Sequence, residues 1–277
     1  MLNKSKTIGL LARFIKDTTV PNIIILQGAG ISVAAGIPDF RTPVTGLYSK
    51  LDKFNLPKPE DIFDINYFRK NPEPFYQIAS DLFPGKVRPT YGHFFSSIMQ
   101  RKNKLLRLYT QNIDGLEQLA GLGELKLIES HGHFRSAHCI DCKKKAVFHE
   151  VYRAIKAKVP ARCQCGGIVK PDIVFFGENL PDRFYTCSEH DFTGCKLMMI
   201  VGTSLQVNPF ASLADYVSPE VPRFLLNNEC VGDFRPDDQS SNDYFIKGDC
   251  QETLKDLAVE LGWDDEIKKM MAKCRIK

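Results

Sequence analysis

The chain has 277 residues, 43% of them hydrophobic, so it can bury the core of one large domain or two. Its formal net charge is only +4, and Lys and Arg form no dense block or stripe interleaved with aromatic residues. Direct nucleic-acid binding is therefore not expected. No apolar run approaches the ~20 residues that a membrane-spanning helix needs, and no secretory signal is visible.

The first segment, residues 4–16, carries four basic side chains before the first acid at Asp17. Its apolar residues recur on one helical face, at Ile8, Leu11, Ala12 and Ile15. Such a segment suits a mitochondrial presequence, and it equally suits a first helix that packs on a sheet. Because a hydrophobic run follows within a few residues, we favour the structural helix. We expect a cytoplasmic and/or nuclear protein, with a mitochondrial location as the alternative.

Six short hydrophobic runs follow, and each ends in a polar cluster. The runs are residues 23–26, 105–109, 125–128, 197–201, 224–226 and 244–246. Apolar runs without alternation are typical of strands that are buried on both faces of a parallel sheet. Ligands of open α/β sheets bind at the carboxyl ends of the strands. If the six runs are parallel neighbours, their polar clusters share one rim and form one site.

The first polar cluster, Gly28-Ala29-Gly30, follows a predicted strand and opens a short predicted helix. Backbone amides in that arrangement can cradle a pyrophosphate, although an ordinary strand–helix turn fits the pattern equally well. The third glycine comes late, at Gly36, and no acidic residue ends a second strand about 20 positions further on, as a dehydrogenase requires. The loop that follows, residues 36–41, brings a carboxylate, an aromatic ring and a guanidinium together.

Nine cysteines, an odd number without a secretory signal, indicate a reducing compartment. Four of them are paired, Cys139 with Cys142 and Cys163 with Cys165. Four thiolates can close tetrahedrally on one zinc and leave no open position for catalysis, an interpretation that we prefer to four free cysteines. The second pair is one residue short of C-x2-C spacing, and the two glycines after it are expected to supply the necessary backbone freedom. His138 is the reserve ligand.

Six segments resemble, in order and spacing, the sirtuin family of NAD-dependent protein-lysine deacylases. They are GAGIS (28–32), GIPDFR (36–41), TQNID (110–114), HG (131–132), KPDIVFFGE (170–178) and GTS (202–204). The paired cysteines lie between the fourth and fifth segments, where this family has its zinc module. The likeness covers about residues 8–263 and is greatest to the class of the human cytosolic and mitochondrial deacetylases.

The resemblance implies an α/β fold with two parts. A Rossmann-like domain with a parallel sheet would comprise residues 1–41, 90–133 and 172–277. A smaller, discontinuous domain would combine a helical module (42–89) with a zinc-binding module, a zinc ribbon (134–171). The cleft between them would hold NAD and acyl-lysine.

The family likeness assigns NAD binding to the polar clusters. The residues expected to bind it are Gly28, Ala29, Gly30, Ser32, Ile37, Asp39, Phe40, Arg41, Gln111, Asn112, Asp114, Gly202, Thr203, Ser204, Asn227, Glu229 and Cys250. Within this set, Asp39 would bind the nicotinamide carboxamide and Phe40 would cover the ribose. Asn227 and Glu229 would hold the adenosine ribose, and Cys250 would lie beside the adenine.

The expected reaction transfers the acyl group of acyl-lysine to ADP-ribose and releases nicotinamide. The resemblance makes His131 the general base on a ribose hydroxyl, with Asn112 as its catalytic neighbour. A histidine suits this role because its ordinary pKa lies near the operating pH. His131 also follows a predicted strand and precedes a glycine on the shared rim. The remaining isolated histidines, among them His93, His149 and His190, are interpreted as packed or surface residues.

The acyl-lysine substrate is expected to contact the fifth segment. Val174 and Phe175 would be the walls of an apolar tunnel, while part of this segment is a buried strand that returns from the zinc module. Main-chain pairing with the substrate would use two edges, Gly177-Glu178 and Val207-Asn208. No Tyr-x-x-Arg pair follows the GIPDFR loop, so neutral acyl groups are expected.

Three other functions use overlapping chemistry. They are a mono-ADP-ribosyltransferase with the same NAD site, an NAD sensor without turnover, and the disfavoured dehydrogenase. We expect acyl-lysine proteins, histones or others, as partners and one structural zinc per chain. The oligomeric state is left open.

Overall fold

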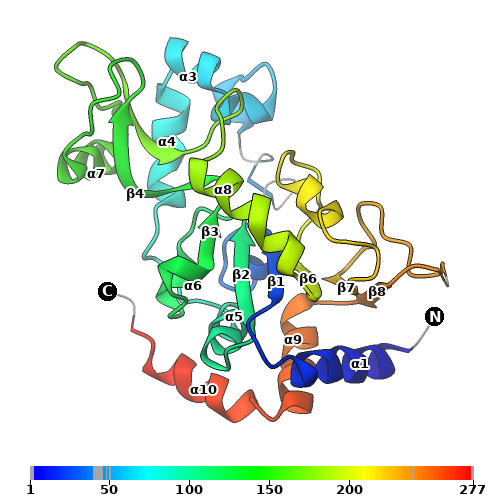
Figure 1. Ribbon diagram of the computed structural model, residues 1–277. Coiled ribbons are helices and arrows are strands. Elements are labelled where there is room, and N and C mark those ends of the chain that lie inside the picture. Colours follow the sequence, from blue (N-terminus) through cyan, green and yellow to red (C-terminus); the bar gives the residue numbers. More distant parts are fainter. Residues whose placement is uncertain (1–2, 40–45, 48, 50, 239, 276–277) are drawn as a thin grey trace.

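A computed structural model describes residues 3–39, 46–47, 49, 51–238 and 240–275 (Figure 1). Its centre is a parallel six-stranded sheet with the order β3-β2-β1-β6-β7-β8. The strands are β1 (Ile23–Gln27), β2 (Leu105–Thr110), β3 (Leu127–Glu129), β6 (Leu197–Val201), β7 (Arg223–Asn227) and β8 (Asp243–Lys247). The six hydrophobic runs thus form neighbouring strands of one sheet, and the prediction of a shared rim is confirmed.

The third strand begins later than predicted. Leu125 belongs to a 3₁₀ helix, Glu124–Lys126, and the residue is 80% exposed. β3 is an edge strand that pairs only with the last residues of β2, so nothing holds the chain extended before Leu127. Lys126 already interrupts the apolar run at this point, and that interruption marks the true start of the strand.

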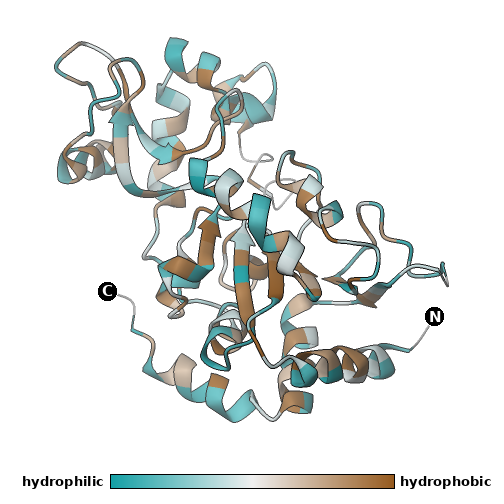
Figure 2. Cartoon of the chain, viewed as in Figure 1, coloured by the Kyte–Doolittle hydropathy of each residue, from teal (hydrophilic) through white to brown (hydrophobic). Residues whose placement is uncertain are grey.

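Helices cover both faces of the sheet. One face packs on α1 (Lys4–Asp17), α5 (Tyr91–Arg101), α9 (Cys250–Leu261) and α10 (Asp264–Lys273); the other packs on α8 (Asp182–Asp191) and the 3₁₀ helices Phe192–Gly194 and Ala211–Asp215. Within β1, Ile23 and Ile25 join the first core while Ile24 and Leu26 join the second. Because both faces are buried, the strands are mostly hydrophobic, with isolated polar residues such as Arg107 in β2 (Figure 2).

The predicted first helix is present as α1. The side chain of Asn3 caps it by accepting a hydrogen bond from the backbone of Lys6 at 2.9 Å. Ile8, Leu11 and Ile15 are buried in the core of the sheet, which confirms the structural interpretation of this apolar face. Within the described part of the chain, no helix has the length and apolar character to cross a membrane.

A third core lies beyond the carboxyl ends of the strands, at the top of Figure 1. It is surrounded by the 3₁₀ helices Asp52–Phe54 and Pro59–Phe63, α3 (Ile65–Lys70), α4 (Glu73–Leu82), α7 (Phe148–Ala157) and the antiparallel hairpin of β4 (Gly132–Cys139) and β5 (Val169–Ile173). Tyr76 in α4 donates its hydroxyl to the carbonyl of Val169 in β5 at 2.8 Å. We call these elements the hairpin region and the sheet with its covering helices the sheet region.

Candidate functional site

One cavity of about 920 Å³ extends along the carboxyl rim of the sheet and under the hairpin region. It brings together nearly all the described residues that were predicted to bind NAD or substrate. Its lining includes Ala29, Gly30, Ile37, Asp39, Gln111, Asn112, His131, Val174, Phe175, Gly177, Glu178, Gly202, Thr203, Ser204, Val207, Asn208, Asn227, Glu229 and Cys250. Phe40 and Arg41 lie outside the described residues.

The cavity lies where the strand order changes direction, between β1 and β6. The loops after these strands touch through their backbones, and Gly30 N donates to Gly202 O at 2.8 Å. A Cβ on Gly30 would lie 2.8 Å from the Cα of Gly202, and one on Gly28 would lie 2.6 Å from the Cβ of Thr203. Glycine is required at both positions for this close approach. Gly28 packs against the loop after β6 and does not line the cavity.

Two of the residues predicted for NAD binding, Ser32 and Asp114, lie in a buried layer behind the cavity wall. Ser32 Oγ donates to Asp114 Oδ2 at 2.6 Å, and Asn112 Nδ2 donates to Ser32 Oγ at 3.3 Å. Asn112 Nδ2 also donates to the carbonyl of Gly28 at 3.1 Å. This layer fixes the Asn112 amide, which itself lines the cavity. Direct contact of Ser32 or Asp114 with NAD stays a prediction.

The same buried layer contains two titratable residues that flank Asp114. His93 is fully buried and accepts a hydrogen bond from the backbone of Thr90 at Nδ1, 3.1 Å away. Burial lowers its pKa to about 4, so it is a neutral packed histidine, as interpreted from the sequence. Glu117, three residues after the TQNID segment, belongs to no motif in the sequence. Burial and then the charge of Asp114 raise the pKa of this carboxyl to about 8, despite the nearby hydroxyl of Thr110.

His131 lies at the junction of the two regions. Its Nδ1 lies 3.0 Å from the carbonyl oxygen of Gln111, and because a carbonyl only accepts, Nδ1 carries the hydrogen. Nε2 is then the unprotonated nitrogen, as a general base requires. Burial lowers the pKa of His131 and outweighs the opposing effect of the Gln111 carbonyl, which keeps the ring neutral.

The backbone fixes this histidine from both sides. Gly132 has φ +76°, and a Cβ there would lie 2.0 Å from the carbonyl oxygen of Asp172. The carbonyl of His131 accepts a hydrogen bond from Val174 N at 2.8 Å. The histidine is thus tied both to the sheet rim and to the segment that leaves β5.

The segment after β5 forms the apolar wall of the cavity. β5 includes the KPDI part of the predicted strand and ends at Ile173, which leaves residues 174–178 as a loop. Phe175 is buried between the rings of Phe63 and Phe75, at centroid distances of 5.8 and 5.0 Å. Phe176 makes an isolated bridge with Asp64. The hairpin region therefore holds the wall in place.

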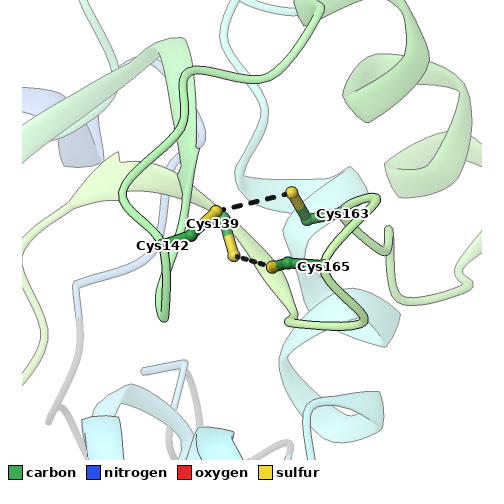
Figure 3. A group of neighbouring side chains, drawn as sticks. All are labelled: Cys139, Cys142, Cys163 and Cys165. Carbon is green, nitrogen blue, oxygen red and sulfur yellow. Dashed lines mark hydrogen bonds between the residues drawn. The ribbon is translucent and has the colours of Figure 1, made fainter.

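The four paired cysteines converge at the tip of the hairpin (Figure 3). Cys139 Sγ lies 3.6 Å from Cys165 Sγ, and Cys142 Sγ lies 3.7 Å from Cys163 Sγ. All four sulfurs lie within 4.8 Å of one another. Tetrahedral zinc with Zn–S bonds of about 2.3 Å places its sulfurs about 3.8 Å apart, so the thiolates fit a structural zinc ion.

The short second pair is accommodated as predicted. Gly166 has φ +86°, and a Cβ on Gly167 would lie 2.7 Å from the sulfur of Cys139. The expected reserve ligand, His138, lies outside the group of four sulfurs. Its Nδ1 lies 2.7 Å from Asp172 Oδ1. The ion site is therefore built from the four cysteines.

Several cavity residues had no signal in the sequence. Phe63 comes from the 3₁₀ helix Pro59–Phe63, Ile113 from the loop after β2, and Leu180 from the stretch before α8. Gln206 and Val231 follow β6 and β7 at a distance of several residues. None belongs to a spacing that indicates chemistry, and of these five only Ile113 lies inside one of the six family segments.

These features define a class: a Rossmann-type α/β protein whose ligand cavity lies between the sheet rim and a hairpin that carries a four-cysteine metal site. Residues 28–209 match the Sir2 family, and the chain belongs to it. It is 49% identical to the NAD-dependent deacetylase sir2A of Dictyostelium discoideum over 97% of its own length and 54% of that protein.

Two further relatives are covered more completely. Identity to the NAD-dependent protein deacetylase hst2 of Schizosaccharomyces pombe is 45%, over 98% of this chain and 81% of the relative. Identity to the NAD-dependent protein deacetylase sirtuin-3 of Mus musculus is 42%, over 96% of this chain and 80% of the relative. The chain thus spans about half of the Dictyostelium protein and four fifths of the other two.

Proposed function

We propose that the chain is an NAD-dependent protein-lysine deacetylase that transfers the acyl group to ADP-ribose and releases nicotinamide. The names of its relatives support this activity. One structural observation supports it most strongly: His131, with Nε2 unprotonated, shares a cavity with the glycine loops and an apolar wall. A general base, a site for a dinucleotide and a site for an acyl chain would thus meet in one place.

NAD would bind along the rim of the sheet. The phosphates would lie against Ala29, Gly30 and the loop after β6, with Ser32 in the buried layer behind them. The adenosine ribose would lie near Asn227 and Glu229, and the adenine beside Cys250. Asp39, at the far side of the glycine loop, would bind the nicotinamide carboxamide. Asn112 would orient the nicotinamide ribose, because the buried layer of Ser32 and Asp114 holds its amide in one position.

Bound NAD supplies a ribose carbon that is activated by a positively charged leaving group. The chain would therefore need to supply only one acid–base group, which removes a single proton. Nε2 of His131 would take that proton from a ribose hydroxyl, and the Gln111 carbonyl would stabilise the ring that becomes charged. The apolar wall of Val174 and Phe175 would exclude water from the reacting atoms.

Acyl-lysine would enter from the hairpin side. Its stem would lie against Val174 and Phe175, and its main chain would pair with Gly177-Glu178 and Val207-Asn208. Specificity would then come from the apolar wall, while main-chain pairing tolerates many sequences. Neutral acyl groups are favoured because the wall residues are apolar.

We further propose the domain division implied by the motifs, with residues 42–89 and 134–171 as the small domain and the rest as the NAD-binding domain. Zinc would be purely structural. Acyl-lysine proteins, histones among them, are the proposed partners. The proposed compartment is the cytoplasm and/or nucleus, with the mitochondrion as the alternative.

Mass spectrometry of an acetyl-lysine peptide, incubated with the protein in the presence and absence of NAD, tests the function. We expect loss of the acetyl mass and appearance of O-acetyl-ADP-ribose only with NAD. Nicotinamide release that does not depend on the acyl-peptide, with ADP-ribose attached to protein, would instead show a mono-ADP-ribosyltransferase. NAD binding without turnover would contradict both activities.

A further inference from the structure

The buried lysine Lys170, in β5, carries a charge behind the cavity wall. We propose that Lys170 is a positioning residue: its ammonium holds the side chain of Glu178 and thereby fixes the turn of residues 175–178, against which the acyl-lysine binds. The inference rests on the proposed function for the identity of the substrate. It deepens that function by assigning a role to a side chain that does not line the cavity.

The ammonium of Lys170 is fully satisfied inside the protein. The residue is only 6% exposed. Its Nζ donates to the carbonyls of Pro171, at 3.2 Å, and Ile173, and it lies 3.0 Å from Glu178 Oε2. An ammonium has three hydrogens, so each has one acceptor. The lysine is consequently held in a single position.

Glu178 transmits this constraint to the turn. The same oxygen that meets Lys170 accepts a hydrogen bond from Phe175 N at 2.9 Å, and Glu178 N donates to Phe175 O at 3.0 Å. Gly177 has φ +87°, which a type II turn requires at its third residue. Side chain and main chain therefore close the turn together.

The lysine also touches the wall residue directly. Its Nζ lies 4.6 Å from the centre of the Phe175 ring, within the range of a cation–π contact. Phe175 lines the cavity on the substrate side. One ammonium thus contacts both the residue that closes the turn and the aromatic ring that the turn presents.

Stability alone does not require an ion pair at this position. Replacing a buried ion pair by apolar side chains is often neutral for stability, whereas removing one partner leaves the other without compensation. Glu178, whose side chain is 27% exposed, can reach water once the ammonium is gone. It would then release Phe175 N, and the turn would lose its position on the substrate side while the glycine loops stay unchanged.

The test compares Lys170→Met, Glu178→Ala and the double variant with the wild type, in the 277-residue chain. Each single change should raise KM for an acetyl-lysine peptide about tenfold, the scale of a lost charge-assisted hydrogen bond, and leave kcat within about threefold. The Kd for NAD should stay within about twofold, since the glycine loops are untouched. The double variant should be no worse than the worse single one, because both changes disrupt one interaction.

Arg107→Met is the matched control. Arg107 pairs with the buried carboxylate of Asp191 at 2.7 Å, in the sheet region and outside the cavity lining. Its loss should lower the melting temperature and leave KM for the peptide unchanged.

If Lys170→Met destabilises the protein as Arg107→Met does and leaves KM within twofold, the positioning role is overturned and the proposed function is not. If Lys170→Met fails to fold, Glu178→Ala carries the test, and an unchanged KM in that variant overturns the inference. A wild type that removes no acetyl group overturns the proposed function itself.

Discussion

The sheet region and the hairpin region contribute to the same cavity by different physical means. In the sheet region, hydrogen-bonded parallel strands bring six loops to one rim, and backbone contacts such as Gly30 N to Gly202 O set the spacing. In the hairpin region, side chains do this work: four thiolates, a cluster of aromatic rings and the pair of Lys170 and Glu178. The difference suggests that reactivity and NAD binding depend on the regular backbone, whereas substrate binding depends on side-chain contacts that single substitutions can remove.

His131→Ala tests the reactive end of the sheet region and should have the largest effect. Loss of a general base lowers kcat by about 10²–10⁴-fold. The Kd for NAD should stay within a few-fold, because the glycine loops hold the dinucleotide independently. His149→Ala, at an exposed position of α7, is the control and should leave kcat unchanged. Undiminished deacetylation in His131→Ala would contradict its assignment as the base.

Cys163→Ser tests whether the hairpin region depends on a metal ion. We expect purified protein to contain one zinc per chain and the variant to lose it, because three thiolates and a hydroxyl bind zinc more weakly. The hairpin region should then unfold at a lower temperature than the sheet region, with activity reduced indirectly.

The matched control for this experiment is Cys187→Ser, a half-buried cysteine of α8 that lies outside the four-sulfur group. It should retain full zinc content by elemental analysis. Protein that is active without any zinc would show that the hairpin region does not need a metal ion to fold.

Asp39→Asn tests the nicotinamide end of the cavity, where Asp39 follows the glycine loop. Replacing a charge-assisted hydrogen bond by a neutral one should weaken the interaction with the nicotinamide carboxamide by about 1–3 kcal/mol. We expect a matching loss in the exchange of labelled nicotinamide into NAD, measured with acyl-peptide present. Asp265→Asn, exposed in α10, is the control. Exchange that proceeds equally well without acyl-peptide would point to another acceptor.

Glu117→Gln should have the smallest effect on activity, because it changes the pH dependence of stability and not the cavity lining. Because the pKa of Glu117 rises from 4.5 to about 8 on folding, the unfolded state binds fewer protons than the native state between these pH values. This group therefore makes the free energy of unfolding fall as the pH rises through that window. Gln does not titrate, so the variant should lose less stability between pH 5 and about 8. Denaturant titrations at several pH values measure this, and parallel curves for both proteins would contradict the raised pKa.

The sequence predicted the sheet region better than the hairpin region, for physical reasons. The strands were visible because burial on both faces leaves a continuous apolar run, and parallel pairing then aligns their ends without further information. The cysteine site was visible because its ligand spacing is local. The pairing of Lys170 with Glu178 was not visible, because it depends on a turn whose position is set by rings from residues 63–75. Likewise, the depth of Ser32 behind Asn112 depends on side-chain packing, which leaves no pattern in the sequence.

Gly132 illustrates how a residue without a side chain can limit the evolution of a protein. Since any Cβ there would lie 2.0 Å from the Asp172 carbonyl oxygen, every substitution must displace the backbone beside His131. Many residues of the cavity wall could be substituted during evolution and so change the preferred acyl group. Substitution of Gly132, in contrast, would disturb the backbone beside His131. Diversity in this protein should therefore accumulate in the side chains of the cavity wall, while His131 and Gly132 are inherited as a unit.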